Sequence, residues 1–101
     1  MAQLIYARHA LTDLERLVEF LVGTEPVVAI ETVDLIAEAI EVLANHPLIG
    51  RPAEKGMREL VISRGHSGYV ALYSYEQGDD TILILAVRHQ REAGYSDETI
   101  V

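Results

Sequence analysis

Hydrophobic and polar residues along the first part of the chain follow one short apolar run and then a helical repeat. The run Leu4-Ile5-Tyr6, within residues 3–6, is long enough for one strand of a sheet. From Ala10 to Val22 aliphatic residues recur every three or four positions, which predicts an amphipathic helix that stops at Gly23. Its predicted inward residues are Leu11, Leu14, Leu17, Val18 and Leu21. Its predicted outward residues are Asp13, Glu15, Arg16 and Glu19.

A second helix is predicted to begin at Thr24-Glu25-Pro26 and to end at Asn45-His46-Pro47. Thr24 can cap its first turn, where proline is tolerated, and the residue before Pro47 avoids the helical region. Because the connection between the helices is short, they should form an antiparallel hairpin whose apolar stripes need an apolar surface to cover. The predicted inward stripe is Ile30, Val33, Ile36, Ala37, Ile40, Leu43 and Ala44, and the predicted outward residues are Glu31, Asp34, Glu38 and Glu41.

The second half of the chain has the shorter repeats of β-strands. Residues 48–52 read as a loop with two breakers, residues 65–68 as a glycine turn and residues 77–80 as a hairpin turn. Strands are predicted at residues 58–62, 69–75 and 81–87. Residues 69–75 alternate, and residues 81–87 are rich in β-branched and aliphatic residues, as in a central strand buried on both faces.

The order β-α-α-β-β-β predicts an α+β fold, a helical hairpin packed on a small, mostly antiparallel sheet. The length of 101 residues fits a single domain spanning residues 1–101, with residues 96–101 expected to be a loose tail. The chain has no cysteine, which excludes a disulfide framework, a thiolate zinc site and a cysteine nucleophile. There is no apolar leader segment, and no run reaches the roughly 18 apolar residues that span a bilayer, so the expected location is the cytoplasm.

Charge is unevenly distributed along the chain. The net charge of −8 argues against nonspecific binding to nucleic acid, where affinity comes from Lys and Arg on phosphates. Residues 1–50 hold two basic and eight acidic residues, whereas residues 51–75 hold four basic and two acidic ones. The acidic load therefore lies mainly on the first half, and we expect a mildly basic face on the second.

The polar groups that folding explains least well gather in the second half, most densely just after residues 81–87. A strand end is a rigid platform, and arginines beside a histidine and a tyrosine can bind phosphate or an acidic partner through forked hydrogen bonds. No cofactor and no metal site are expected, because the glycines match no phosphate-cradling pattern and the histidines lack carboxylates at ligand spacing. The candidate target- or partner-binding residues are Arg51, Arg58, Arg64, Arg88, His89, Arg91 and Tyr95.

Each candidate also has a plainer interpretation. Arg88 and Arg91 fit a solvated exit loop after a buried strand, and Arg58 fits a surface ion pair with Glu59. His89 has a pKa range suited to a general base, yet a hydrogen-bonded structural role is commoner for a lone histidine. The alternating tyrosines of residues 69–75 favour sheet packing over base stacking.

Four stretches together, at these intervals, resemble the RelE/ParE superfamily of toxins from bacterial type II toxin–antitoxin modules, and most of all its ParE, or plasmid-stabilisation, branch. The resemblance covers nearly the whole chain. The stretches are Ala10-x-x-Asp13-Leu14, Leu43-Ala44-x-His46-Pro47-x-x-Gly50-Arg51-Pro52, Arg58-Glu59-Leu60-Val61, and residues 84–95, ILAVRHQREAGY.

The resemblance implies a protein that arrests the growth of its own host cell unless an antitoxin, ParD-like or similar, covers it. ParE-like members are associated with inhibition of DNA gyrase, whereas RelE-like members cleave messenger RNA on the ribosome. In both branches the toxin–antitoxin complex commonly represses its own operon, so operator DNA would be bound only through the antitoxin. Whether the chain forms a homodimer or a higher toxin–antitoxin complex stays open at this point.

The charge balance bears on the choice between these two activities. A ribosome-bound nuclease needs a basic face for ribosomal RNA and several Lys, Arg or Tyr groups to stabilise a charged transition state. This chain has one lysine, Lys55, so the acidic balance favours a protein target, DNA gyrase, and a toxin that is not an enzyme. The alternatives are a ribosome-dependent endoribonuclease and an inactive regulatory member that only binds the antitoxin. We expect the antitoxin to cover a groove between the helical hairpin and the sheet edge, next to the basic residues there.

Overall fold

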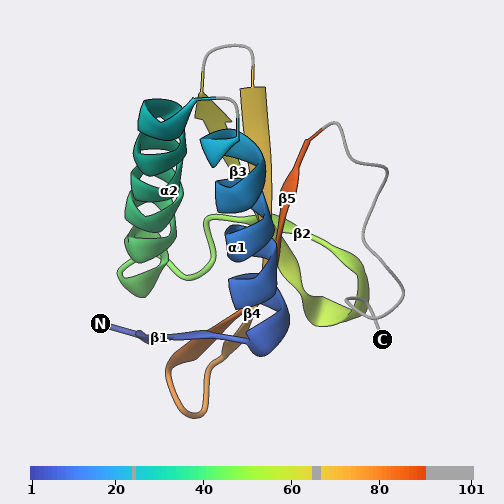
Figure 1. Ribbon diagram of the computed structural model, residues 1–101. Coiled ribbons are helices and arrows are strands. Elements are labelled where there is room, and N and C mark those ends of the chain that lie inside the picture. Colours follow the sequence, from blue (N-terminus) through green and yellow to red (C-terminus); the bar gives the residue numbers. More distant parts are fainter. Residues whose placement is uncertain (24, 65–66, 91–101) are drawn as a thin grey trace.

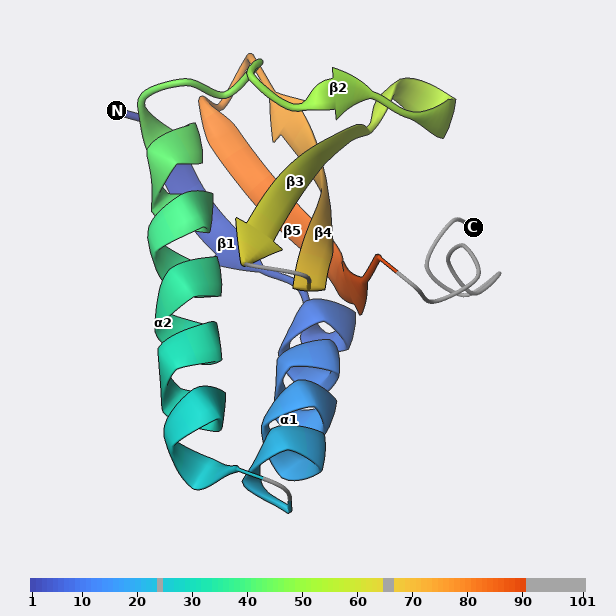
Figure 2. The ribbon, with the colours of Figure 1, turned by 90° about the horizontal axis from the view of Figure 1, so that it is seen from above.

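The computed structural model describes residues 1–23, 25–64 and 67–90. Two helices lie side by side and antiparallel on one face of a five-stranded sheet (Figures 1 and 2). The helices are α1 (Arg8–Val22) and α2 (Pro26–Glu41), followed by the 3₁₀ turns η1 (Val42–Ala44) and η2 (Glu54–Gly56). The strands are β1 (Gln3–Tyr6), β2 (Arg51–Pro52), β3 (Arg58–Arg64), β4 (Ser67–Glu76) and β5 (Thr81–His89).

The sheet order is β1-β5-β4-β3-β2, with β1 parallel to β5 and every other pair antiparallel. The predicted α+β fold and element order are confirmed. The structure adds β2, a two-residue strand that pairs with the start of β3 in the segment predicted as a loop. So short an edge strand leaves no periodic pattern in the sequence, and Pro52 suits an edge because it has no N–H to donate.

The helix boundaries differ from the prediction by a few residues. Helix α1 begins at Arg8, because the N–H of Ala7 donates to the carbonyl of Ile84 (2.9 Å) and so anchors the first turn to β5. Helix α2 begins at Pro26, as the proline signal indicates, and tightens into η1 before Pro47. The glycine turn predicted at residues 65–68 is shorter than expected, since β4 already begins at Ser67.

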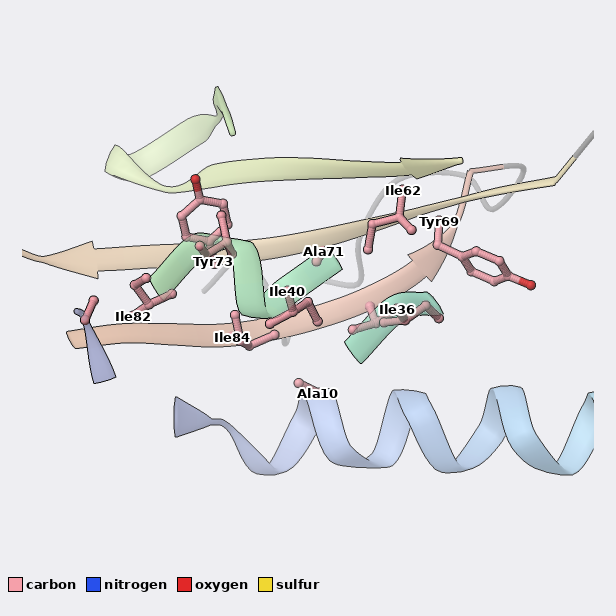
Figure 3. Close-up of a cluster of buried hydrophobic side chains, with 12 residues drawn as sticks. Ala10, Ile36, Ile40, Ile62, Tyr69, Ala71, Tyr73, Ile82 and Ile84 are labelled. Atoms are coloured by element: carbon pink, nitrogen blue, oxygen red, sulfur yellow. The ribbon is translucent and has the colours of Figure 1, made fainter. Parts of the chain in front are cut away.

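The hydrophobic core lies between the helical hairpin and the sheet (Figure 3). It joins Ala10 of α1 and Ile36 and Ile40 of α2 to Ile82 and Ile84 of β5, all at most 1% exposed. The predicted alternation in β4 is confirmed, because its odd-numbered residues face the helices. Tyr69, Ala71 and Tyr73 are buried there and Tyr75 packs against the edge of the cluster.

The predicted inward faces of both helices are partly wrong. Asp13, predicted to face solvent, is fully buried, whereas Leu11 and Ile30, predicted to face the core, are 48% and 67% exposed. Each helix is rotated so that small or hydrogen-bonded residues approach the sheet, with Ala29 and Thr32 buried in α2. A count of apolar positions cannot locate this rotation, because it depends on which polar group finds a partner across the interface.

Strand β5 was predicted to be buried on both faces, and this holds only for its last part. Residues 81–85 alternate between partly exposed and buried, and burial becomes continuous from Ala86 to Arg88. The change coincides with a register shift, because Tyr73 pairs with Ile84 while Leu72 pairs with Ala86, which leaves Leu85 as an extra residue. Such a bulge re-aims the side chains that follow it, here those at the end of β5.

Candidate functional site

The end of β5 is held by helix α1 instead of by a neighbouring strand. Strand β1 accompanies β5 only as far as Ile84, so the backbone N–H of Val87 has no strand partner on that side. Asp13 takes the place of the missing strand, because its Oδ2 accepts the hydrogen bond from the Val87 N–H at 2.9 Å. A side chain on α1 therefore fixes the backbone of β5 where the predicted site begins.

The Asp13 carboxylate also gathers the cationic groups around it. Its Oδ1 accepts hydrogen bonds from Arg88 Nη1 (3.2 Å) and from Arg16 Nη2. His9 Nε2 lies 3.6 Å from Asp13 Oδ2 and 3.4 Å from Arg88 Nη2. We call these four residues, Asp13 with His9, Arg16 and Arg88, the Asp13 cluster.

The Asp13 cluster is buried at its centre and exposed at its rim. The side chains of Asp13 and Arg88 are 1% and 10% exposed, whereas those of His9 and Arg16 are 33% and 57% exposed. One carboxylate faces two guanidinium groups, so the cluster has a net positive charge on a strongly acidic chain. Its exposed rim can bind an anionic group of a partner, such as a carboxylate or a phosphate.

Arg88 is therefore not part of a solvated exit loop, which was the plainer interpretation of this residue. It is buried and bound to Asp13. Its neighbour His89 is partly exposed, and its ring meets the ring of Tyr69 edge-on at a centroid distance of 5.3 Å. Because the His89 side chain is only partly buried, a partner can reach part of its ring.

Arg51, in β2, and Arg58, at the start of β3, belong to a different part of the molecule, next to the loop between η1 and β2. Arg58 Nη1 donates to the carbonyls of Leu48 (3.2 Å) and Gly50 (2.7 Å), so the predicted ion pair of Arg58 with Glu59 is wrong. It is Arg51 that pairs with Glu59, with 3.0 Å between Nε and Oε1. Neighbours in sequence point to opposite faces of a strand, which explains why Arg58 and Glu59 do not meet.

Tyr73 completes the support of the same loop from below. Its buried hydroxyl donates to the carbonyl of Pro47 (2.8 Å) and accepts from the N–H of Gly50 (2.9 Å). A Cβ at Gly50 would lie 2.6 Å from this hydroxyl and 2.8 Å from the carbonyl of Glu59, so only glycine fits. Gly50 in the Pro47-x-x-Gly50 motif is therefore required because the loop approaches the sheet closely at this residue.

The structure does not bring all the predicted site residues together. In the strand register Arg58 of β3 lies opposite Tyr73 of β4, and His89 of β5 lies opposite Tyr69. Arg58 and His89 are therefore about 13 Å apart along β4 at the usual rise per residue. The backbone of Arg64 lies at the His89 end of the sheet, across β4 from it. Arg91 and Tyr95 lie outside the described residues.

Asp13, His9 and Arg16 are the residues of this site that sequence reasoning assigned to other roles. A signal was present, because Asp13 lies three residues after Ala10 and four before Leu17, in the middle of the stripe that packs on the sheet. A charge within an apolar stripe indicates a buried partner, and here the partner lies 75 positions further along the chain.

Among residues 1–23, 25–64 and 67–90, no three His, Cys, Asp or Glu side chains are grouped so that they could hold a metal ion. The described helices are all too short or too polar to cross a membrane.

Burial and nearby charge make the stability of this fold sensitive to alkaline pH. The pKa of Tyr73 is raised above 10.0, chiefly by burial, and that of Tyr6 is raised by burial and by the nearby Glu41 carboxylate. The native state therefore retains these protons more tightly than the unfolded chain. Stability from this source is complete below pH 10 and is lost as the pH rises above it.

Urea unfolding at increasing pH should show this decline, and Tyr73→Phe should make it shallower. An equal decline in both proteins would contradict the assignment.

Comparison with known proteins identifies the family to which this chain belongs. The sequence model of the family described as "ParE toxin of type II toxin-antitoxin system, parDE" matches residues 4–94. The chain belongs to the ParE toxin family. The match spans both the Asp13 cluster and the loop that Tyr73 and Arg58 support, so the family assignment and the toxin role rest on nearly the whole chain.

Relatives with RelE-type and ParE-type names are both similar to the chain. The chain is 38% identical over 80 residues to the toxin RelE3 of Caulobacter vibrioides, which covers 79% of this chain and 85% of the relative. Among solved structures it is similar to a chain of the chromosomal ParDE toxin–antitoxin system from P. aeruginosa, with a TM-score of 0.72, 27% identity, and coverage of 87% of this chain and 95% of that one. A chain of the toxin–antitoxin complex RelBE2 from Mycobacterium tuberculosis shares the fold, with a TM-score of 0.58, 24% identity, and coverage of 88% and 98%.

Proposed function

We propose that this ParE-family toxin arrests growth by inhibiting DNA gyrase and that a cognate antitoxin neutralises it. The observation that carries the choice of a protein target is the charge balance, a net −8 with Lys55 as the one lysine. A chain of this charge is repelled by the ribosomal RNA surface that a ribosome-dependent nuclease must approach. Such a toxin would act in the cytoplasm, where gyrase lies.

The contacts of the arginines support the same choice. A nuclease needs arginines that can turn toward a scissile phosphate. Arg88 is buried against Asp13, and Arg58 is bound to two loop carbonyls, so both are engaged in contacts that hold the fold. The groups that we propose contact a target are the exposed rim of the Asp13 cluster, the partly exposed His89, and Arg91 and Tyr95 further along the chain.

Expression of the chain without its antitoxin is expected to stop growth, and purified protein should inhibit supercoiling by gyrase. The triple variant His89→Ala, Arg91→Ala and Tyr95→Ala should lose at least about tenfold in inhibition, because it removes three proposed target contacts. Its unfolding midpoint is measured alongside, which separates a loss of target binding from a loss of stability. Normal supercoiling at saturating wild-type protein would exclude gyrase as the target.

A ribosome-dependent endoribonuclease is the second candidate, favoured by the 38% identity to a toxin named RelE3. In that case translation would stop within minutes of induction, messages would be cleaved, and supercoiling would stay normal. Measuring supercoiling and translation in the same culture separates the two candidates. A chain that is harmless when expressed alone would favour a regulatory, antitoxin-binding role.

Antitoxin binding is proposed because both structural relatives come from toxin–antitoxin systems, ParDE and RelBE2. We propose that the antitoxin covers the surface between the helical hairpin and the sheet edge, where the basic residues that follow α2 lie. Operator DNA would be reached through the antitoxin, and the assembly would be a toxin–antitoxin complex of two or more chains.

A further inference from the structure

The loop of residues 47–51 is fixed in position to an unusual degree for a surface segment. The carbonyls of Pro47, Leu48 and Gly50 accept hydrogen bonds from Tyr73 or Arg58, and the N–H of Gly50 donates to Tyr73. The N–H of Ile49 donates to the carbonyl of His46 at 3.2 Å. Surface loops are ordinarily among the more mobile parts of a protein, so this support maintains one particular shape.

Two aliphatic side chains project from this rigid loop into solvent. Leu48 and Ile49 are 52% and 53% exposed, and neither belongs to the hydrophobic core between the helices and the sheet. Scattered exposed aliphatics are normal on a protein surface. Two adjacent ones on a loop that the fold holds rigid are different, because a preorganised contact loses little conformational entropy when it binds.

The charges around this pair indicate the chemistry of its partner. Residues 46–58 contain Arg51, Lys55 and Arg58 against Glu54 alone, whereas residues 1–45 contain two basic and eight acidic residues. Glu59 forms an ion pair with Arg51, so the two charges offset each other, and residues 46–59 have a net charge of +1 against −6 for residues 1–45. The Arg58 guanidinium, bound to the carbonyls of Leu48 and Gly50, places a positive charge beside the apolar pair, and this combination fits a peptide that carries both aliphatic and carboxylate side chains.

We propose that the loop of residues 47–51 is a preformed docking loop for the antitoxin. Leu48 and Ile49 contact the apolar side of an acidic antitoxin segment, and carboxylates of that segment meet Arg58 and, further along the chain, Lys55. This inference rests on the proposed neutralisation by an antitoxin and is independent of whether the target is gyrase or the ribosome.

The fold offers a matched pair of variants for the test. Leu48→Ser with Ile49→Ser removes the apolar pair of the loop and leaves its backbone hydrogen bonds to Tyr73 and Arg58. Val27→Ser with Ile30→Ser removes two aliphatic side chains of α2, each 67% exposed, among acidic neighbours. Both variants should unfold at the wild-type midpoint, which circular dichroism checks.

The affinity of each protein for the product of the adjacent reading frame is then measured by calorimetry. The loop variant should bind about 10- to 100-fold more weakly, and the α2 variant should stay within about twofold of the wild type. Lys55→Gln should lower the association rate mainly at low salt.

Equal affinity in the loop variant and the wild type would overturn the proposal. A loss of supercoiling inhibition with unchanged antitoxin affinity would assign the loop to the target, and wild-type self-association abolished by the loop variant would assign it to a second copy of the chain. If the wild type does not bind that product at all, the proposal fails together with neutralisation. If instead gyrase is unaffected by the wild type, only the proposed target fails and the affinity comparison still decides.

Discussion

Replacing Asp13 with alanine is expected to lower the free energy of unfolding by about 3–5 kcal/mol, the usual cost of removing one member of a buried ion pair. Two buried groups lose a hydrogen-bond acceptor at once, the Arg88 guanidinium and the N–H of Val87, and the Arg88 charge loses its carboxylate. Against a total stability of about 5–15 kcal/mol for a domain of this kind, the variant would be close to unfolding. Urea unfolding monitored by circular dichroism measures the difference.

Asp34→Ala is the matched control, because it removes an exposed carboxylate from the outer face of α2 and should change stability by less than about 0.5 kcal/mol. The double variant Asp13→Ala with Arg88→Met should be less destabilised than the sum of the single changes, since it leaves no buried guanidinium uncompensated. Strict additivity in this cycle, or a loss at Asp13 no larger than at Asp34, would show that the ion pair does not hold the end of β5.

Replacing Tyr73 with alanine should cost about 3–5 kcal/mol, as for other large aromatic side chains deleted from a core. The ring is completely buried between the helices and the sheet, and its hydroxyl carries the loop of residues 47–51. Tyr73→Phe separates these contributions. It keeps the ring and leaves the Gly50 N–H without its acceptor, which should cost about 1–3 kcal/mol.

Tyr75→Phe is the control for the hydroxyl, because Tyr75 lies on the same strand face but its hydroxyl bonds to Asp80 at the surface. It should lower stability less than Tyr73→Phe. Hydrogen exchange should also be faster at Gly50 and Ile49 in Tyr73→Phe and unchanged there in Tyr75→Phe. Unaltered exchange in the loop of the Tyr73 variant would mean that Arg58 alone fixes its shape.

Both predictions concern connections that also position the candidate binding surfaces. Asp13 sets where β5 ends and hence how His89 is presented, and Tyr73 sets the shape of the loop that carries Leu48 and Ile49. If replacing Asp13 or Tyr73 abolishes toxicity or antitoxin binding, the cause would therefore be displacement of the binding residues, because neither side chain is itself proposed to contact a partner. The exposed residues His89, Leu48 and Ile49 are the ones whose replacement reports on binding itself.

Much of the fold followed from the sequence alone. The period of two in β4 predicted that its tyrosines share one face of the strand, the proline and glycine signals placed most element boundaries within a few residues, and four short motifs identified the superfamily. These features are local, because each depends on residues within one turn or one strand. The alkaline limit of stability and the rotation of the helices were beyond such reasoning.

The tertiary structure alone decided which polar residues are structural and which are available to a partner. Asp13, on a helix face predicted to be solvated, meets Val87 74 positions later, and two of the predicted arginines separate, Arg58 to the loop and Arg88 to the end of β5. A buried charge is stable only where the fold supplies its partner, and that partner is distant in sequence. The sequence by itself therefore determined the family and the order of elements, whereas long-range hydrogen bonding determined the site.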